Sequence, residues 1–431
     1  MEIERIKKVI VDQKEELEEF FKTEKIIQRE LDMEKLRKFL AYPNVLVITG
    51  PRRSGKSTLA MMLFDGEKFG YLNFDDERLA GFSAGDFNTA LLAFYDLYGQ
   101  DIKCFVFDEI QNISGWELFI NRLRRTKKIV ITGSNANLLS GDLATHLTGR
   151  YLEAVLYPFS FREFLKAKEA AIEKEDFYST KKISLINKYL NEYLKIGGFP
   201  ETLRFGQVIA GKIYEDVITK DILLRYGIKN KNSFREMSNY LISNFSSKIN
   251  YAKIGRAFFI KNVHTVRNYA DYLSSSFLVI IVEKFSYKKK LQFSTSKKIY
   301  GIDTGLVNSI AFQISSNEGR IMENAVLLDL KRRGDYGDDK FEVYYWSDYL
   351  GKEVDFAVKK GKRIIQLIQV CQSLQNIETK EREIKSLLKA SRELQCDNLL
   401  IITASEEAVE KIEGKEISII PLWKWLMSGL A

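Results

Sequence analysis

Short apolar runs alternate with longer amphipathic segments over the first third of the chain. The runs are rich in β-branched residues, which favours strands, and the segments between them repeat their apolar positions at helical spacing. This alternation predicts a mostly parallel α/β sheet that is covered by helices on both faces. We expect strands near 45–49, 70–74, 103–107, 128–132 and 151–156, and helices near 56–64, 86–97, 115–125 and 136–146.

The pattern changes outside this region. Residues 1–43 are charged and helical, whereas residues 157–228 lose the strand rhythm and contain a strong turn at Gly197-Gly198. Residues 229–300 predict three helices, a strand and a basic stretch, and the remaining residues return to α/β patterning. We therefore expect a leader and core at 1–156, a helical lid at 157–228, a third domain at 229–300 and a C-terminal α/β domain at 301–431.

Composition indicates a soluble protein of several domains. Of the 431 residues, 45% are hydrophobic, which is enough for packed cores. The three cysteines are isolated and lie in apolar runs, so neither a disulfide framework nor a zinc site is indicated. The N-terminus does not resemble a signal peptide and no apolar stretch approaches the length of a membrane span, so we expect a cytoplasmic protein.

The turn after the first predicted strand carries a phosphate-binding pattern. Gly50 is followed by four residues and then by Gly55, Lys56 and Ser57, which open a helix. Glycines let successive backbone N–H groups face a polyphosphate, and the start of a helix favours negative charge. In this pattern the lysine reaches the β- and γ-phosphates and the serine hydroxyl binds Mg²⁺. The residues expected to bind ATP are Gly50, Pro51, Arg52, Arg53, Ser54, Gly55, Lys56, Ser57 and Thr58.

Two adjacent carboxylates end the third predicted strand. Asp108 is placed to hold Mg²⁺, and Glu109 is the candidate general base that polarises the attacking water. The fourth strand ends in Gly133-Ser134-Asn135, where Asn135 is expected to sense the γ-phosphate or the lytic water. A simple helix N-cap at Ser134 or Asn135 is the alternative. Together with the upstream turn, the two carboxylates predict hydrolysis of the nucleotide.

These motifs, together with Leu147-Thr-Gly-Arg-Tyr151, resemble those of AAA+ ATPases. More narrowly, the chain resembles an archaeal and bacterial group whose members end in a restriction-endonuclease-like domain of unknown function. The resemblance implies that Arg150 is an arginine finger, which completes a neighbouring subunit's site and implies a homo-oligomer. A surface arginine that pairs with Glu153 or Asp142 is the alternative. The further matching segments are 156–164, 196–201, 219–223, 353–356 and 368–371.

Positive charge is concentrated in residues 229–300. This segment holds fourteen lysines and arginines and three acids, a net charge of +11, whereas the whole chain carries +8. The order of its elements predicts a winged helix-turn-helix, whose third helix enters a DNA groove. The candidate DNA-binding residues are His264, Thr265, Arg267 and Asn268 on that helix and Lys288, Lys289 and Lys290 on the wing, with contacts mainly to the DNA backbone.

Two other interpretations of this basic segment remain open. A winged helix is also a common module for packing against the chain's own ATPase core or against a partner protein. A lysine-rich surface also keeps a protein soluble without binding anything.

The C-terminal domain lacks part of the nuclease signature. Glu323 and Asp355 can supply carboxylates for Mg²⁺, but the position expected to read Glu-x-Lys reads Gln369-Val370-Cys371. We therefore expect a degenerate nuclease-like domain without cleavage activity. The whole sequence predicts an ATP- and Mg²⁺-dependent AAA+-type ATPase that acts on duplex or junction DNA. The alternative is a nucleotide-dependent switch that controls a protein partner.

Overall fold

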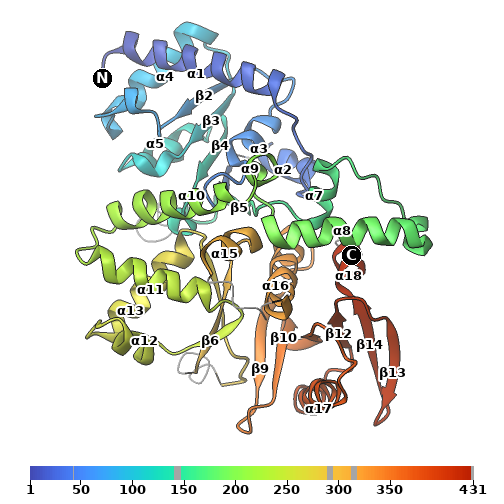
Figure 1. Cartoon of the computed structure of the whole chain (residues 1–431). Helices are drawn as coiled ribbons and strands as arrows, with labels where there is room; N and C mark the ends of the chain where they lie inside the picture. Colours follow the sequence, from blue (N-terminus) through green and yellow to red (C-terminus); the bar gives the residue numbers. More distant parts are fainter. Residues whose placement is uncertain (42, 140–146, 289–294, 312–317, 429–431) are drawn as a thin grey trace. The chain divides into compact units, whose positions relative to one another are not determined.

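A five-stranded parallel sheet forms the centre of the first of two units, Met1–Tyr157 and Pro158–Ala431 (Figure 1). The structure is a computed structural model, and it describes residues 1–41, 43–139, 147–288, 295–311 and 318–428. The strands of the first unit are β1 (Val45–Thr49), β2 (Phe69–Asn73), β3 (Cys104–Asp108), β4 (Lys128–Gly133) and β5 (Tyr151–Val155). Their order in the sheet is β2-β3-β4-β1-β5, so the predicted parallel core is confirmed.

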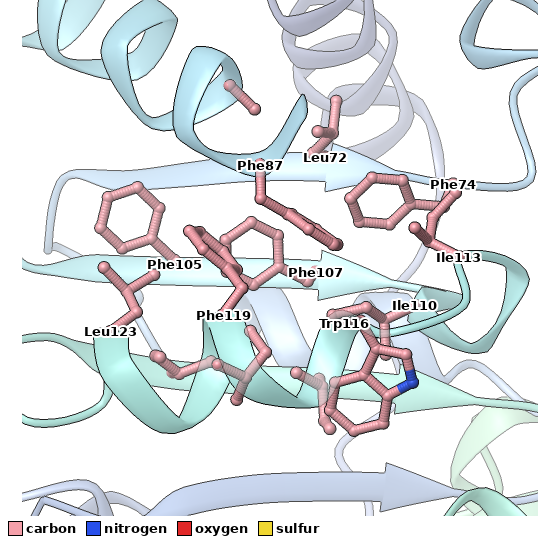
Figure 2. Close-up of a cluster of buried hydrophobic side chains, with 14 of the residues drawn as sticks. Leu72, Phe74, Phe87, Phe105, Phe107, Ile110, Ile113, Trp116, Phe119 and Leu123 are labelled. Atoms are coloured by element: carbon pink, nitrogen blue, oxygen red, sulfur yellow. The ribbon is translucent and has the colours of Figure 1, made fainter. Parts of the chain in front are cut away.

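Helices and aromatic side chains cover this sheet. The helices are α1 (Ile3–Thr23), α2 (Met33–Leu40), α3 (Lys56–Met62), α4 (Phe87–Tyr98) and α5 (Trp116–Leu123), with short 3₁₀ turns η1 (Glu77–Leu79), η2 (Ala84–Asp86) and η3 (Ile110–Asn112). Residues of α1, α4 and α5 share one core with the strands. Figure 2 shows this core, in which Phe87 of α4 and Phe119 of α5 stack with ring centroids 4.5 Å apart. Because side chains alternate along a strand, Phe107 of β3 enters this core whereas Asp108 points to the other face.

One expected helix of the core differs from the structure. The described part of the helix expected at 136–146 is the 3₁₀ turn η4 (Ala136–Leu139). Residues 140–146, which include Asp142, lie outside the described residues.

The second unit begins with helices, as expected for 157–228. These are α7 (Phe161–Ala167), η5 (Lys174–Tyr178), α8 (Thr180–Ile196), α9 (Pro200–Phe205), α10 (Val208–Asp216) and the π-helix η6 (Val217–Leu224). Residues of α7 and α8 share a buried core with the C-terminal sheet of the same unit. The boundaries expected at 228 and 300 stay predictions.

A three-stranded sheet and three helices follow. The elements are α11 (Lys231–Ser243), β6 (Ser247–Ile249), α12 (Tyr251–Ala257), α13 (Val263–Ser275), β7 (Val279–Val282) and β8 (Lys297–Gly301), with antiparallel sheet order β6-β8-β7. The three helices expected in this segment are α11, α12 and α13.

The C-terminal part is a six-stranded mixed sheet with helices. Its elements are α15 (Thr304–Ile310), α16 (Glu318–Tyr336), β9 (Glu342–Ser347), β10 (Glu353–Lys360), β11 (Arg363–Val370), α17 (Ile377–Leu394), β12 (Leu399–Thr403), β13 (Ala408–Ile412), β14 (Lys415–Pro421) and α18 (Leu422–Met427). The strand order is β13-β14-β12-β11-β10-β9. Within the described ranges, no helix is both long and apolar enough to cross a membrane.

Close backbone packing accounts for the double glycine after α8. A Cβ atom on Gly198 would lie 2.2 Å from the carbonyl oxygen of Phe159, and one on Gly305 would lie 2.0 Å from that of Ile196. The Gly198 N–H also donates to the buried carboxylate of Asp303 at 2.6 Å. The motif at 196–201 therefore fixes how α8, α15 and the start of the unit pack together.

Candidate functional site

The carboxyl ends of four parallel strands are aligned at one edge of the first sheet. Thr49 of β1 pairs with Gly133 of β4, and Asn73 of β2 pairs with Asp108 of β3. The turn after β1, the carboxylates after β3 and the polar residues after β4 therefore lie at the same edge. Open α/β sheets bind ligands at this edge.

The turn after β1 has a backbone that requires glycine at its start. Gly50 has a φ of 149°, and a Cβ atom there would lie 2.3 Å from the carbonyl oxygen of Leu156. Gly55, where α3 begins, has a φ of 93°, a region that favours glycine. The hydroxyl of Ser54 is buried and has no hydrogen-bond partner within the described part of the chain. The Ser54 hydroxyl is therefore available as a donor to a ligand. At Gly50 the turn has no room for a side chain.

Lys56 is the buried cation of this turn. Its side chain is 4% exposed, and its Nζ atom donates to the carbonyl oxygen of Pro51 at 3.1 Å. The same Nζ atom lies 3.6 Å from Oε1 of Glu109. A buried ammonium is costly without a partner, and a polyphosphate would give it several. The turn therefore fits a phosphate group.

Glu109 lies beside this cation in a restrained position. Its φ is 50°, and its carboxylate accepts hydrogen bonds from the Ser134 hydroxyl at 3.1 Å and from the Gln111 side-chain amide. Burial acts to raise the pKa of Glu109, but the charge of Lys56 and these hydrogen bonds outweigh it, so the pKa is lowered. The carboxylate is therefore ionised at neutral pH, as a general base must be.

Asp108 is the most deeply desolvated acid at this edge. It accepts a hydrogen bond from Tyr71 Oη at 2.8 Å and another from the Thr132 hydroxyl. Burial raises the pKa of Asp108, and the charge of Glu109 adds to this effect, while hydrogen bonds that include one from Ser57 act in the opposite direction. A cation beside this carboxylate would stabilise its charged form, so Asp108 and Ser57 fit a Mg²⁺ ion.

The remaining two predicted residues occupy different places. Asn135 follows the end of β4 and is 5% exposed, and the hydroxyl of the neighbouring Ser134 contacts Glu109. Arg150 is exposed and lies at the opposite edge, where its carbonyl oxygen accepts from Val45 N at 3.0 Å. The five residues of β1 separate the two edges by about 16 Å. The structure therefore does not bring Arg150 to the phosphate turn of its own chain.

Four of the candidate DNA-binding residues lie on helix α13 and three follow β7. His264, Arg267 and Asn268 are exposed and Thr265 is partly exposed, whereas Val266 is buried. Lys288 is also exposed. Lys289 and Lys290 lie outside the described residues.

A second cluster of charged residues lies in the second unit and joins the predicted carboxylates Glu323 and Asp355 to Lys298 and Glu353, whose part in it sequence reasoning missed. The Nζ atom of Lys298 on β8 lies 3.0 Å from Glu323, 2.6 Å from Glu353 and 2.9 Å from Asp355. Tyr300 donates to Glu323 at 2.7 Å. The nuclease pattern expects a lysine two residues beyond Gln369, whereas here the lysine comes from β8, far earlier in the chain. No local sequence signal marks this arrangement.

This cluster does not fit a metal ion. The ammonium of Lys298 already lies among the three carboxylates, and the described residues include no group of three or more His, Cys, Asp or Glu side chains arranged for a metal. Gln369 is also engaged, because its side-chain oxygen accepts from Asp355 N at 3.3 Å. Burial raises the pKa of Glu323 to about 7.

Three family models match successive parts of the chain. Residues 42–165 match an AAA domain, residues 187–318 match a domain of unknown function (DUF8612), and residues 318–425 match another (DUF4143). The AAA match spans the phosphate turn, both carboxylates and Arg150.

The chain is also similar to whole proteins. It is 36% identical to the uncharacterized protein MJ1544 of Methanocaldococcus jannaschii over 95% of this chain and 93% of that protein. It is 31% identical to an uncharacterized protein of Haemophilus influenzae over 93% of this chain and 99% of that protein. Among solved structures, the Walker-type ATPase paby2304 of Pyrococcus abyssi has a TM-score of 0.40 at 12% identity, covering 67% of this chain and 98% of that chain.

Proposed function

The chain belongs to the same family as protein MJ1544 of Methanocaldococcus jannaschii and contains an AAA domain, and from this premise we propose that it hydrolyses ATP. The observation that carries the proposal is the convergence of a buried lysine, a desolvated aspartate and an ionised glutamate at one sheet edge. Lys56 lies 3.6 Å from Glu109, and Asp108 is adjacent to that glutamate.

Each residue has a distinct role in this proposal. The turn from Gly50 to Thr58 binds the phosphates through backbone N–H groups, and Lys56 neutralises their charge. Ser57 and Asp108 would hold Mg²⁺, which when bound offsets the negative charge of the phosphates. Glu109 accepts a proton from the attacking water, because its carboxylate is ionised and buried.

We propose DNA as the partner of the second unit. Residues 237–270 contain five lysines and arginines and no acid, so the segment that includes α12 and most of α13 is cationic, and Asp271 is the exposed acid near the end of α13. The order helix, strand, two helices and two strands in residues 231–301 supports a winged helix. With few side chains that read bases, binding would depend mainly on the DNA backbone and shape.

Steady-state ATP hydrolysis tests both parts. Turnover is measured with and without single-stranded, duplex and four-way-junction DNA, at low and moderate salt. We expect Glu109→Gln to retain ATP and lose turnover by about 10²- to 10⁴-fold, whereas Lys56→Ala loses ATP binding. Stimulation by DNA that fades with salt would support the DNA partner. Wild-type turnover in Glu109→Gln would disprove its role as the base.

One observation favours a second candidate function, a nucleotide-dependent switch that controls a protein partner. Glu109 is held by Ser134, Gln111 and Lys56 in this structure, and a restrained base is compatible with slow turnover. In that case hydrolysis only resets a conformational state. Slow turnover, retained ADP and no response to any DNA would favour the switch.

A further inference from the structure

Phe259 ends helix α12 in a conformation that glycine usually supplies. Its φ is 56°, its N–H bonds the carbonyl oxygen of Arg256 at 3.5 Å, and the next N–H, of Ile260, bonds that of Gly255 at 2.8 Å. These two bonds form the helix-ending motif in which the left-handed residue is most often glycine. A phenylalanine at this position carries backbone strain that glycine would not.

Packing among the residues that the structure describes does not compensate for this strain. The Phe259 side chain is 92% exposed. In contrast to Phe259, the neighbouring Phe258 packs edge to face against Tyr240, with ring centroids 5.4 Å apart. The fold therefore uses the ring of Phe258 and leaves the ring of Phe259 facing solvent. A partner outside the chain can supply stabilising contacts for that exposed ring.

The charged residues around Phe259 indicate which kind of partner could bind there. Arg256 and Lys261 flank it and are exposed, and no acid occurs between Glu236 and Asp271. The partner must therefore offer negative charge together with a flat apolar surface. A nucleic acid offers both, because phosphates lie beside bases whose faces stack on aromatic rings.

We infer that Phe259 stacks on an unstacked base, so that the DNA preferred by this surface is single-stranded or interrupted duplex. This inference rests on the proposed DNA partner and names the class of DNA. In a continuous duplex the base faces are covered by their neighbours, so the ring gains little. At a gap or junction, a base face is available for stacking.

Equilibrium binding to matched DNAs tests the inference. The probes are a paired duplex and the same duplex with a short gap that contains 2-aminopurine, whose fluorescence reports stacking. We expect Phe259→Gly to bind the gapped DNA roughly tenfold more weakly, to bind the paired duplex unchanged and to lose the fluorescence change. Phe259→Trp should keep both the affinity and the signal.

Two controls separate the outcomes. Phe259→Gly relieves backbone strain, so an unchanged or raised Tm would show that lost binding is not unfolding. Tyr178→Ala, which removes a ring that is 91% exposed, should bind both DNAs as the wild type does. Equal binding of gapped DNA by the wild type and Phe259→Gly would overturn the inference while leaving the DNA partner intact. Absence of wild-type binding to any DNA would instead refute the proposed partner and this inference together.

Discussion

The buried carboxylate of Glu323 makes the stability of the second unit, Pro158–Ala431, depend on pH. Burial and the neighbouring charge of Asp355 raise its pKa from 4.5 to about 7, although Lys298 and Tyr300 act in the opposite direction. Between about pH 4.5 and pH 7, Glu323 therefore keeps a proton in the folded protein that it has released in the unfolded chain. The stabilising contribution is complete below about pH 4.5 and is lost as the pH rises through about 7.

The size of the effect follows from the two pKa values. A change from 4.5 to about 7 corresponds to about 3 kcal/mol in total, at about 1.4 kcal/mol per pH unit. Of this, about 2 kcal/mol is lost between pH 5.5 and pH 8. Glu323→Gln mimics the protonated form and cannot ionise, so the variant should lack this component of the pH dependence.

Urea unfolding of the full chain at pH 5.5 and pH 8 measures the difference. Tryptophan fluorescence is suitable because Trp346, Trp423 and Trp425 all belong to the C-terminal unit. We expect the wild type to lose about 2 kcal/mol more than Glu323→Gln over this pH range. Glu378→Gln, which changes an exposed carboxylate, serves as the matched control and should follow the wild type. Parallel pH profiles for the wild type and Glu323→Gln would refute the reasoning.

Two further predictions concern packing and assembly. Gly198→Ala should lower the free energy of unfolding of the second unit by about 1–3 kcal/mol or more, because its Cβ would lie 2.2 Å from the Phe159 carbonyl oxygen. In the same urea titration Gly211→Ala serves as the control. Gly211 lies in a helix with open space around it, so this variant should not be destabilised. If Arg150 completes a neighbouring subunit's site, the variants Arg150→Ala and Lys56→Ala should each be inactive alone and should recover ATP hydrolysis when they are mixed. A mixture without ATP hydrolysis would count against the trans arrangement.

The sequence predicts the first sheet well because its central strands β1, β3 and β4 are short, mainly apolar runs. It also predicts the glycine-rich turn after β1, since the residues of that turn come from one stretch between Gly50 and Thr58, and their binding of phosphate stays a prediction. The restraint on Glu109 was harder to predict. It depends on Gln111 and Ser134, and which polar residue after β4 turns toward the carboxylate is decided by side-chain packing. Asn135 and Ser134 cannot be distinguished for this role by strand pattern alone.

Clusters that are assembled from distant segments cannot be predicted in the same way. Lys298 approaches Glu323 and Asp355 because β8, α16 and β10 pack together. The spacing of these residues in the sequence does not predict this contact. The position two residues beyond Gln369, where the nuclease pattern places a lysine, is Cys371. The structure supplies the missing ammonium and also shows why it does not restore a metal site. The charge that would otherwise attract a metal is already balanced in part by Lys298, whose removal would leave the buried carboxylates of Glu323 and Asp355 without that cation.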